Sequence, residues 1–323
     1  MDEIQSGGQP PLISVVMCAY NGMPYIHAAV QCILDQTYSN WELIISDDGS
    51  NDGTREWLTT LADPRIRVFL QEKNLGYVAN KNFAHRQARG EYITQMDNDD
   101  LCPPDRLAKQ YAALQQNKGV RLVAGLYERI DNEGRVYDRQ KVFSGGLITS
   151  FPGEYPFWFP VLLVHRSVFE EIGYFEEYFG GIYGDDIYWA VRANEKYPIY
   201  CINEVLYSYR NNPGSIVNVL TNRRKLIMTD VLDELFRQRK EKGTDWLQQG
   251  DLARIEQYEQ SLFANKKLMS DKYRLWAAKH IDKGDLDKGR ELLAKAIGLH
   301  PTSLTNLRTL VYYAKARLRN KKR

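Results

Sequence analysis

The chain has 323 residues, a formal net charge of +2 and 26% charged residues. That length accommodates one sizeable catalytic domain with a smaller appendage, and it exceeds a single minimal module. A nearly balanced charge gives no overall attraction to nucleic acid, so nucleic acid is not an expected partner and other partners must be sought in local patches.

Cysteine spacing and hydropathy argue against a zinc-binding, a secreted or a membrane-spanning protein. The four cysteines lie far apart and form no C-x-x-C pair, which argues against a zinc site or a secreted disulfide framework. Residues 1–11 lack the pattern of a signal peptide, and the longest apolar run, 157–164, is too short to span a bilayer. We therefore expect a cytoplasmic protein with reduced thiols.

Short apolar runs alternate with helical periods through the first 125 residues. Strands are predicted at 13–18, 41–46, 66–70, 92–96 and 120–124, and helices at 25–36, 52–61, 76–89 and 104–116. Such alternation of strands and helices is typical of βαβ units and predicts a mostly parallel sheet covered by helices.

Two acidic clusters follow predicted strands, Asp47-Asp48 after the second and 97–100 after the fourth. The carboxyl ends of strands line the ligand crevice of an open α/β sheet, so both clusters should meet at one site. The spacing Asp97-x-Asp99 puts two carboxylates on one side of an extended chain, where a hard divalent cation could be shared with substrate phosphates. A solvated turn rich in Asp is the alternative, and the position after a strand weighs against it.

The alternation fails between residue 127 and about residue 160. Aromatic residues crowd into 151–159, around Trp158, and this loop either covers a core or presents flat apolar faces to a sugar. A third acidic pair, Asp185-Asp186, opens a predicted helix. The alternative to a catalytic role is N-capping of a helix that begins near Ile187, and a base at a helix N-terminus would keep a low pKa through the helix dipole.

From about residue 222 onward the pattern is helical and charged. Residues 272–301 indicate a helix pair somewhat like a tetratricopeptide repeat, although a single copy favours a plain helical hairpin. The stretch 308–323 carries seven Lys or Arg residues and no acid. It predicts either peripheral contact with an anionic membrane, which would place the protein at the inner face of the cytoplasmic membrane, or a solvated, frayed helix end.

Six motifs occur in a fixed order along the chain. They are residues 13–22, Asp35-Gln36-Thr37-Tyr38, residues 47–54, Asn74-x-Gly76, Asp97-x-Asp99-Asp100 and Gly184-Asp185-Asp186. Together they resemble the motifs of family 2 inverting glycosyltransferases with the GT-A fold. The resemblance implies a Rossmann-like α/β domain at 11–215, with a nucleotide-binding half (11–125) and an acceptor-binding half (126–215), followed by a helical C-terminal region at 216–323.

The activity implied by the resemblance is transfer of a hexose or N-acetylhexosamine from a UDP-sugar to a hydroxyl of a saccharide or lipid-linked saccharide, in surface polysaccharide or glycan synthesis. Tyr20 would stack on uracil and Asp48 would accept a hydrogen bond from the ring N3. The basic Lys81 would help to neutralise phosphate charge. The nucleotide-sugar-binding set implied in this way is Ala19, Tyr20, Asn21, Asp48, Asn74, Gly76, Lys81, Asp97 and Asn98.

The resemblance also implies the catalytic centre. Asp99 would coordinate Mn²⁺ or Mg²⁺ bridging the diphosphate, with Asp97 beside it, and Asp186 would be the base. The acceptor would contact Trp158, Gly184 and Asp185. One departure is Asn212, which stands where many relatives have a His that contacts metal or diphosphate; Asn212 offers a weaker metal oxygen, and diphosphate contact falls to Arg210 or Ser215.

Two other classes of protein compete with this interpretation. A catalytically idle nucleotide-sugar-binding or scaffold protein could use the helical C-terminal region to bind partners, but the intact acidic residues at 48, 97, 99 and 186 disfavour it. A dinucleotide-binding enzyme would need Gly-x-Gly-x-x-Gly after the first strand, where Ala19-Tyr20-Asn21-Gly22 stands instead.

Overall fold

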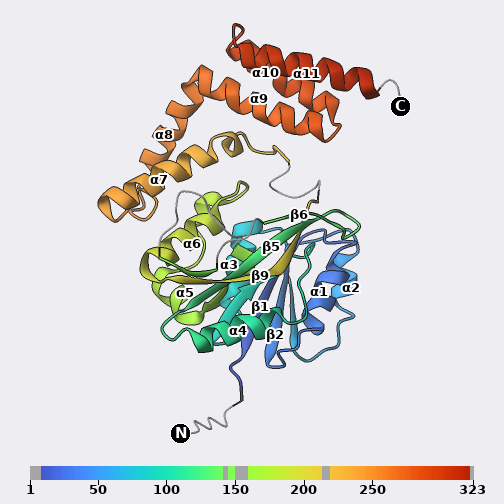
Figure 1. Ribbon diagram of the computed structural model, residues 1–323, viewed down its shortest axis with the longest axis vertical. Coiled ribbons are helices and arrows are strands. Elements are labelled where there is room, and N and C mark those ends of the chain that lie inside the picture. Colours follow the sequence, from blue (N-terminus) through green and yellow to red (C-terminus); the bar gives the residue numbers. More distant parts are fainter. Residues whose placement is uncertain (1–8, 141–144, 150–158, 213–218, 321–323) are drawn as a thin grey trace. The chain divides into compact units, whose positions relative to one another are not determined.

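The computed structural model describes residues 9–140, 145–149, 159–212 and 219–320. By its internal contacts the chain divides into two compact units, 1–219 and 220–323 (Figure 1). The domain boundary predicted at 215/216 lies outside the described residues, as do Trp158 and Ser215.

The first unit is built on one sheet, whose strands run in the spatial order β3-β2-β1-β4-β8-β5-β9-β7, with β6 paired to β5. The strands are β1 (Ile13–Ala19), β2 (Trp41–Asp47), β3 (Ile66–Leu70), β4 (Tyr92–Gln95), β5 (Leu122–Ile130), β6 (Val136–Arg139), β7 (Gly146–Ile148), β8 (Leu163–His165) and β9 (Ile199–Arg210). Strands β3, β2, β1 and β4 are mutually parallel, so their carboxyl ends share one edge of the sheet.

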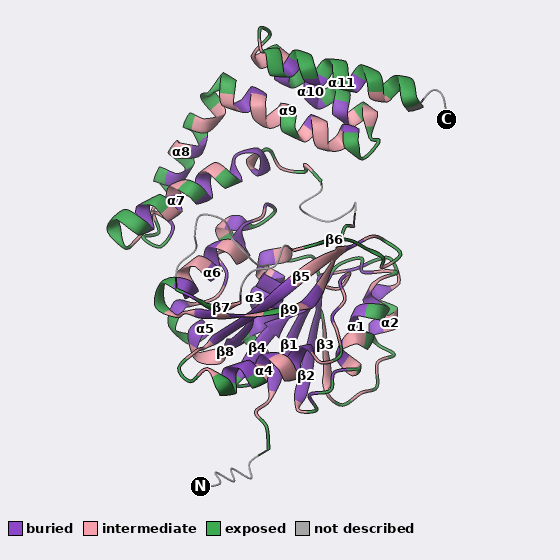
Figure 2. Ribbon diagram, viewed as in Figure 1, coloured by how far each residue is buried: buried purple, intermediate pink, exposed green. Residues whose placement is uncertain are grey.

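Helices flank this sheet. They are α1 (Ile26–Leu34), α2 (Thr54–Leu58), α3 (Tyr77–Arg86), α4 (Arg106–Gln116), α5 (Arg166–Ile172) and α6 (Asp185–Lys196). The apolar residues of β1 and β2 are buried, because helices on the sheet exclude water from them (Figure 2). The strand and helix alternation predicted for the first 125 residues is confirmed.

Beyond residue 125 the sheet differs from a simple alternating series. Strand β8 lies antiparallel between β4 and β5, and β5 then pairs in parallel with the long strand β9. Residues 199–210 form a strand that the sequence does not predict, because apolar and polar residues follow each other there without a strict period of two. The sheet is therefore mixed, with its parallel half carrying the first two acidic clusters.

The second unit is helical, as predicted. Its helices are α7 (Met228–Lys242), α8 (Leu252–Ala264), α9 (Lys266–Asp282), α10 (Leu286–Leu299) and α11 (Leu304–Asn320). The helix pair expected at 272–301 is formed by α9 and α10, and Figure 1 shows α11 alongside them. A Cβ added at Gly289 would lie 2.7 Å from Ile281 Cγ1, so the absence of a side chain there permits the close approach of α9 and α10.

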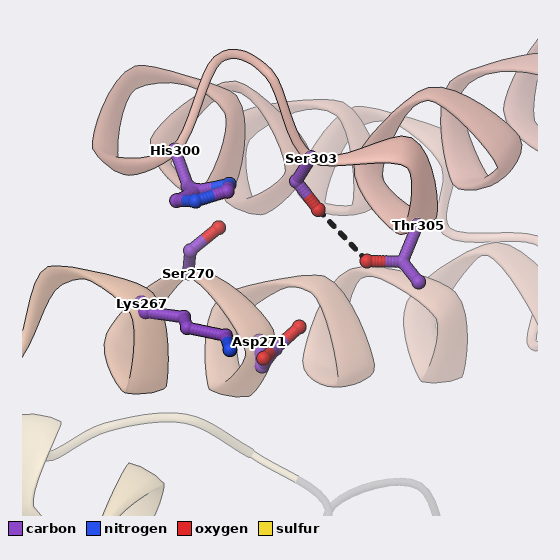
Figure 3. A pocket seen from close by; sticks show the side chains of 6 residues that line it. All are labelled: Lys267, Ser270, Asp271, His300, Ser303 and Thr305. Atoms are coloured by element: carbon purple, nitrogen blue, oxygen red, sulfur yellow. Dashed lines mark hydrogen bonds between the residues drawn. The ribbon is translucent and has the colours of Figure 1, made fainter.

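Ala277, Ile281, Leu292, Leu293 and Tyr313 form the buried core of this hairpin and α11. Figure 3 shows a pocket between α9 and the α10–α11 connection, where Ser303 Oγ and Thr305 Oγ1 are 2.8 Å apart. It is lined by Lys267, Ser270, Asp271, His300, Ser303 and Thr305. None of the motifs from the first unit contributes to it. In the part of the chain that the structure describes, every helix is too short or too polar to cross a membrane.

Candidate active site

The loop after β1 is fixed by the loop after β2. The backbone N–H of Asn21 donates to Ser50 Oγ (2.8 Å), and Asn21 Oδ1 accepts from the N–H of Asn51 (2.9 Å). Asn21 itself has a φ of 49°, a left-handed conformation that Asn tolerates better than most residues. Ala19 is buried, whereas Tyr20 is 53% exposed. The arrangement holds the backbone around Tyr20 and leaves its ring open to a ligand.

The two neighbouring carboxylates at the end of β2 have different surroundings. Asp48 is buried and accepts hydrogen bonds from the N–H groups of Leu75 (2.6 Å) and Gly76 (3.1 Å). Burial raises the pKa of Asp48, and the two backbone amides oppose that shift. Asp47 instead forms an ion pair with Arg55 (Nη1 to Oδ2, 3.0 Å), so its role is structural.

The segment Asn74-x-Gly76 joins Asp48 to α3. Asn74 Nδ2 donates to the backbone oxygen of Asp48 (3.0 Å), and Asn74 Oδ1 accepts from the N–H of Gly76 (3.0 Å). Gly76 has a φ of +87° and immediately precedes α3. A residue with a side chain would be strained in that conformation, which explains a glycine between the Asp48 contact and the helix.

Lys81, on α3, is buried and not a solvated surface charge. Its Nζ lies 2.9 Å from Asp185 Oδ2, and the two side chains are 1% and 5% exposed. The ammonium group also lies 3.7 Å from the centre of the Phe175 ring. This ion pair joins α3 to the start of α6, more than a hundred residues later in the chain.

The acidic loop after β4 begins with Asp97, Asn98 and Asp99, all partly buried. Gln95 Nε2 donates to Asp97 Oδ1 (2.7 Å), and Asn212 Nδ2 donates to Asp99 Oδ2 (3.2 Å). Burial, and then repulsion from Asp99, raises the pKa of Asp97 to about 6. Burial also raises the pKa of Asp99, against the hydrogen bond from Asn212.

Asp100 anchors this loop to β9. It is fully buried and accepts from the Tyr207 hydroxyl (2.7 Å) and from the N–H of Arg210 (2.6 Å). The Arg210 side chain donates from Nε to the backbone oxygen of Asp99 (2.7 Å) and from Nη1 to those of Asp131 and Asn132. These contacts give Arg210 a structural role in holding the acidic loop, and they occupy three of its five donor hydrogens.

Asp185 and Asp186 lie in the first turn of α6, and Gly184 is the N-cap. The alternative interpretation, in which this pair only caps a helix beginning near Ile187, is therefore wrong: the helix begins two residues earlier than Ile187. Asp186 Oδ1 accepts from the N–H of Ile187 (2.8 Å). The expectation of a low pKa is also wrong, because burial and then repulsion from Asp185 outweigh nearby favourable groups and raise the pKa of Asp186 to about 6.

Parallel pairing of β1 with β2 and β4, and the contact of Lys81 with Asp185, bring these groups to one site, and their pKa shifts agree with this. Lys81 lowers the pKa of both Asp97 and Asp186, while Asp186 raises that of Asp97. The partly buried thiol of Cys18, on β1, has a pKa that is raised by burial and then shifted by the charges of Lys81, Asp97, Asp48 and Asp185. All three acidic clusters therefore converge on the edge where β1, β2 and β4 end.

Sequence reasoning missed two members of this site. Tyr77 is partly buried, and its pKa is raised well above the usual value by burial and then by the charges of Asp97 and Asp185. It follows Gly76 directly and precedes Lys81 by one helical turn, a spacing that identifies it as a neighbour on the same face of α3. Tyr207, which supports the acidic loop, lies on the unpredicted strand β9.

The loops after β1 and β4 are also packed together. A Cβ built on Gly22 would lie 2.4 Å from Asn98 Nδ2, so a side chain at position 22 would displace Asn98. The close atom is the end of the Asn98 side chain, so a larger residue at position 22 would require that amide to turn away.

The donor set of the acidic loop fits Mn²⁺ or Mg²⁺ held jointly with a substrate. Among the described residues, neither Asp97 nor Asp99 forms an ion pair with Lys or Arg, and their mutual repulsion raises the pKa of Asp97. The same residues contain no cluster of three or more His, Cys, Asp or Glu side chains suited to a metal. Mg²⁺ commonly takes one or two carboxylates, with substrate phosphates supplying further ligands, so this pair is a sufficient protein contribution.

Residues 14–173 match the model of the family described as glycosyl transferase family 2. The chain is similar to a glucosyltransferase of Escherichia coli, the UDP-Glc:alpha-D-GlcNAc-diphosphoundecaprenol beta-1,3-glucosyltransferase WfgD. The two sequences are 34% identical over 125 residues, which are 39% of this chain and 49% of that protein. Glycosyltransferase GlyG of Streptococcus pneumoniae is 36% identical over 128 residues, covering 39% of this chain and 42% of the relative. The matches thus span half or less of the length of these relatives.

Similarity in fold extends further along the chain. The structure of Staphylococcus aureus TarS residues 1–349 in complex with UDP superposes with a TM-score of 0.56 at 17% identity, over 89% of this chain and 88% of that one. The mixed sheet, the flanking helices and the helical C-terminal region together confirm the predicted GT-A fold class. With the family match over 14–173 and the predicted motifs at the edge of the sheet, the chain belongs to glycosyl transferase family 2.

Proposed function

We propose that this protein transfers a hexose or N-acetylhexosamine from a UDP-sugar, with inversion, to a hydroxyl of a saccharide or lipid-linked saccharide during surface polysaccharide synthesis. The observation that carries the proposal is the convergence of Asp48, Asp97 and Asp186 from three distant segments at one edge of the sheet. Family 2 membership supports the reaction class. The name of WfgD describes a UDP-glucose donor and a diphosphoundecaprenol-linked acceptor, and this supports the choice of donor and acceptor.

In this proposal the uridine lies between the loops after β1 and β2. The exposed ring of Tyr20 stacks on uracil, because a tyrosine face is apolar and its rim polar. Asp48 accepts a hydrogen bond from the uracil N3–H. Its two backbone donors leave lone pairs on the carboxylate for this third partner, since two carboxylate oxygens accept about four hydrogen bonds.

The acidic loop holds the diphosphate end of the donor. Asp97 and Asp99 would hold Mn²⁺ or Mg²⁺, and the ion, when bound, supplies Lewis-acid stabilisation of the charge that develops on the departing UDP. Tyr207, Asp100 and Arg210 keep this loop in place through hydrogen bonds between β9 and residues 97–100.

Asp186 acts as the general base. The acceptor hydroxyl loses its proton to Asp186 as its oxygen attacks the anomeric carbon, and the bond from that carbon to UDP breaks on the opposite face. A pKa of about 6 suits this role, since the carboxylate is ionised at neutral pH yet basic enough to accept a proton in the transition state.

Lys81 has a positioning role in this mechanism. Its buried contact with Asp185 fixes the first turn of α6, and its charge favours the ionised form of Asp186. A direct contact between Lys81 and diphosphate would require the ammonium group to leave or share its partner Asp185. We therefore assign Lys81 to the acceptor side of the site in preference to the predicted phosphate contact.

A donor screen tests the function. The purified chain would be incubated with UDP-glucose, UDP-galactose, UDP-N-acetylglucosamine or UDP-N-acetylgalactosamine, Mn²⁺ and a lipid-linked or short-chain saccharide acceptor, and products identified by mass spectrometry. We expect one preferred UDP-sugar to give a glycosylated product with inverted anomeric configuration. Binding of UDP without transfer to any acceptor would favour the idle binding protein, and a preference for GDP over UDP in calorimetry would exclude the roles given to Tyr20 and Asp48.

A further inference from the structure

Helix α11 has one face that packs on its own unit. Asn306, Thr309 and Tyr313 are buried at a spacing of three and four residues, which places them on a single side of the helix. Asn306 Nδ2 donates to Ser270 Oγ (2.9 Å) on α9 and to the backbone oxygen of Ala296 (3.2 Å) on α10. The orientation of α11 on the hairpin is therefore fixed by specific contacts.

A second face of α11 is apolar and open. Leu304, Leu307, Val311 and Leu318 are 45% to 71% exposed and follow a spacing of three, four and seven residues, with exposed Ala314 completing the series. That spacing aligns them in a stripe along the helix, away from the buried face. Figure 2 shows α11 largely in the colour of exposed residues. Exposing so many aliphatic side chains in one row is unfavourable in water and points to a covering surface.

Basic side chains border this apolar stripe. At about 100° per residue, Arg308, Lys315 and Arg319 lie along one margin and Arg317 along the other. All four are exposed, and residues 304–320 contain no Asp or Glu. An apolar stripe with cationic margins is complementary to a bilayer surface, where acyl chains accept the leucines and anionic headgroups face the basic residues.

We propose that this face of α11, defined by the stripe and its four basic residues, docks on an anionic lipid bilayer. A second copy of the chain is a poorer occupant. Pairing two such stripes as a helix seam would bring the basic margins of both copies together, and like charges at those positions oppose association. The proposal concerns the C-terminal unit and does not depend on the proposed transfer reaction.

Flotation with lipid vesicles tests the proposal on the full chain. The vesicles would contain either phosphatidylcholine alone or equal parts of phosphatidylcholine and phosphatidylglycerol. We expect binding to the anionic vesicles, weaker binding at high salt because ions screen the headgroup charge, and little binding to phosphatidylcholine. Replacing Arg308, Lys315 and Arg319 together by Gln should weaken binding about 100-fold, since each basic residue near an anionic surface contributes about a factor of five.

The apolar half of the face is tested by a second variant with Leu307→Ser, Val311→Ser and Leu318→Ser, which should also lose vesicle binding. The matched control replaces Leu252 and Leu275, leucines of similar exposure on α8 and α9, by Ser and should bind like the unaltered chain. Circular dichroism would verify that each variant is folded, as expected for substitutions of exposed side chains.

Three results would overturn the proposal. The first is that the control variant loses vesicle binding as much as the α11 variants do, and the second is that both α11 variants bind vesicles like the parent chain. The third is that the parent chain binds no vesicles and forms a dimer in size-exclusion chromatography, which the serine variant converts to a monomer. Transfer to a water-soluble acceptor should be unaffected in all variants, so a failure of lipid docking is distinguishable from a failure of the proposed reaction.

Discussion

Two of the three acidic clusters, Asp185-Asp186 and the loop after β4, differ in how their charge is balanced. Asp185 has an internal cation, because the buried Lys81 lies 2.9 Å from it. The loop after β4 has no such partner for Asp97 or Asp99 among the described residues; each accepts a hydrogen bond from a neutral amide. The fold thus balances the charge of Asp185, while the other cluster keeps a negative charge that an external cation can balance.

This difference in charge balance suits the two clusters to different roles, one as a base and the other as a metal site. A carboxylate pair with a fixed internal cation keeps its geometry and can be tuned as a base, whereas an unpaired carboxylate pair is suited to bind a metal together with its ligand. We therefore expect variants of Asp185-Asp186 to change the rate of transfer, and variants of the loop after β4 to change donor binding as well.

The largest effect is expected for Asp186→Asn. Loss of a general base should lower the rate of transfer by about 100-fold to 10,000-fold, while affinity for UDP stays within about twofold because the role proposed for Asp186 is toward the acceptor. Transfer kinetics and calorimetry with UDP would measure the two quantities. Asp105→Asn, at an exposed carboxylate paired with Lys109, is the matched control and should behave like the parent chain. Near-normal turnover in Asp186→Asn would refute the assignment of the base.

The next largest effect is expected for Asp99→Ala. Removing this carboxylate should weaken Mn²⁺-dependent UDP binding at least about 10-fold and should impair transfer in proportion, since a metal at this position would contribute several kcal/mol to charge stabilisation. Calorimetry with and without a chelator gives the test. If the parent chain binds UDP equally well in both conditions, the acidic loop is not a metal site.

Local sequence patterns were sufficient to place the acidic clusters. Asp48 and Asp97 follow apolar runs that form β2 and β4, and parallel strands bring their carboxyl ends to one edge. The pairing of Lys81 with Asp185 was not predictable in this way. It depends on contacts among α3, α6 and Phe175 that are far apart in the sequence, and a lone Lys on a helix is ordinarily exposed.

The start of α6 shows a second limit of local patterns. Asp favours N-cap positions, so a cap at 185–186 was the alternative to a catalytic role. Gly184 takes that position with a φ of 111°, and the two acids enter the first turn beside each other. Their mutual repulsion and burial then reverse the expected direction of the pKa shift, a tertiary effect that outweighs the helix dipole.

A smaller effect, on pH dependence, is expected for Lys81→Met. Transfer should fall as pH drops through about 6, because protonated Asp186 cannot accept a proton. Without Lys81 the Asp186 carboxylate loses a cation that favours its ionised form, so its pKa rises and the acidic limb moves to higher pH, by about one unit. The pH profile of kcat measures this shift.

Lys81→Arg is the matched control for this prediction. It preserves the charge beside Asp185 and should restore most of the acidic limb, whereas a phosphate-binding role would appear as a higher KM for the donor in Lys81→Met with an unshifted pH profile. The two roles considered for Lys81 are distinguished by which of these parameters changes.

The smallest effect is expected for Tyr207→Phe, which tests how the acidic loop is held. The Tyr207 hydroxyl donates to Asp100 Oδ2 (2.7 Å) and accepts from the N–H of Asp97 (3.1 Å), and both contacts would be lost without a large change in shape. Leaving buried polar groups unpaired should lower the free energy of unfolding by about 1–3 kcal/mol, measured by urea denaturation. The comparison between the clusters predicts a further result: Mn²⁺-dependent UDP affinity should fall in Tyr207→Phe, while the pH profile set by Asp186 should stay in place. A shifted profile would mean that the two clusters are not independent and that β9 controls both.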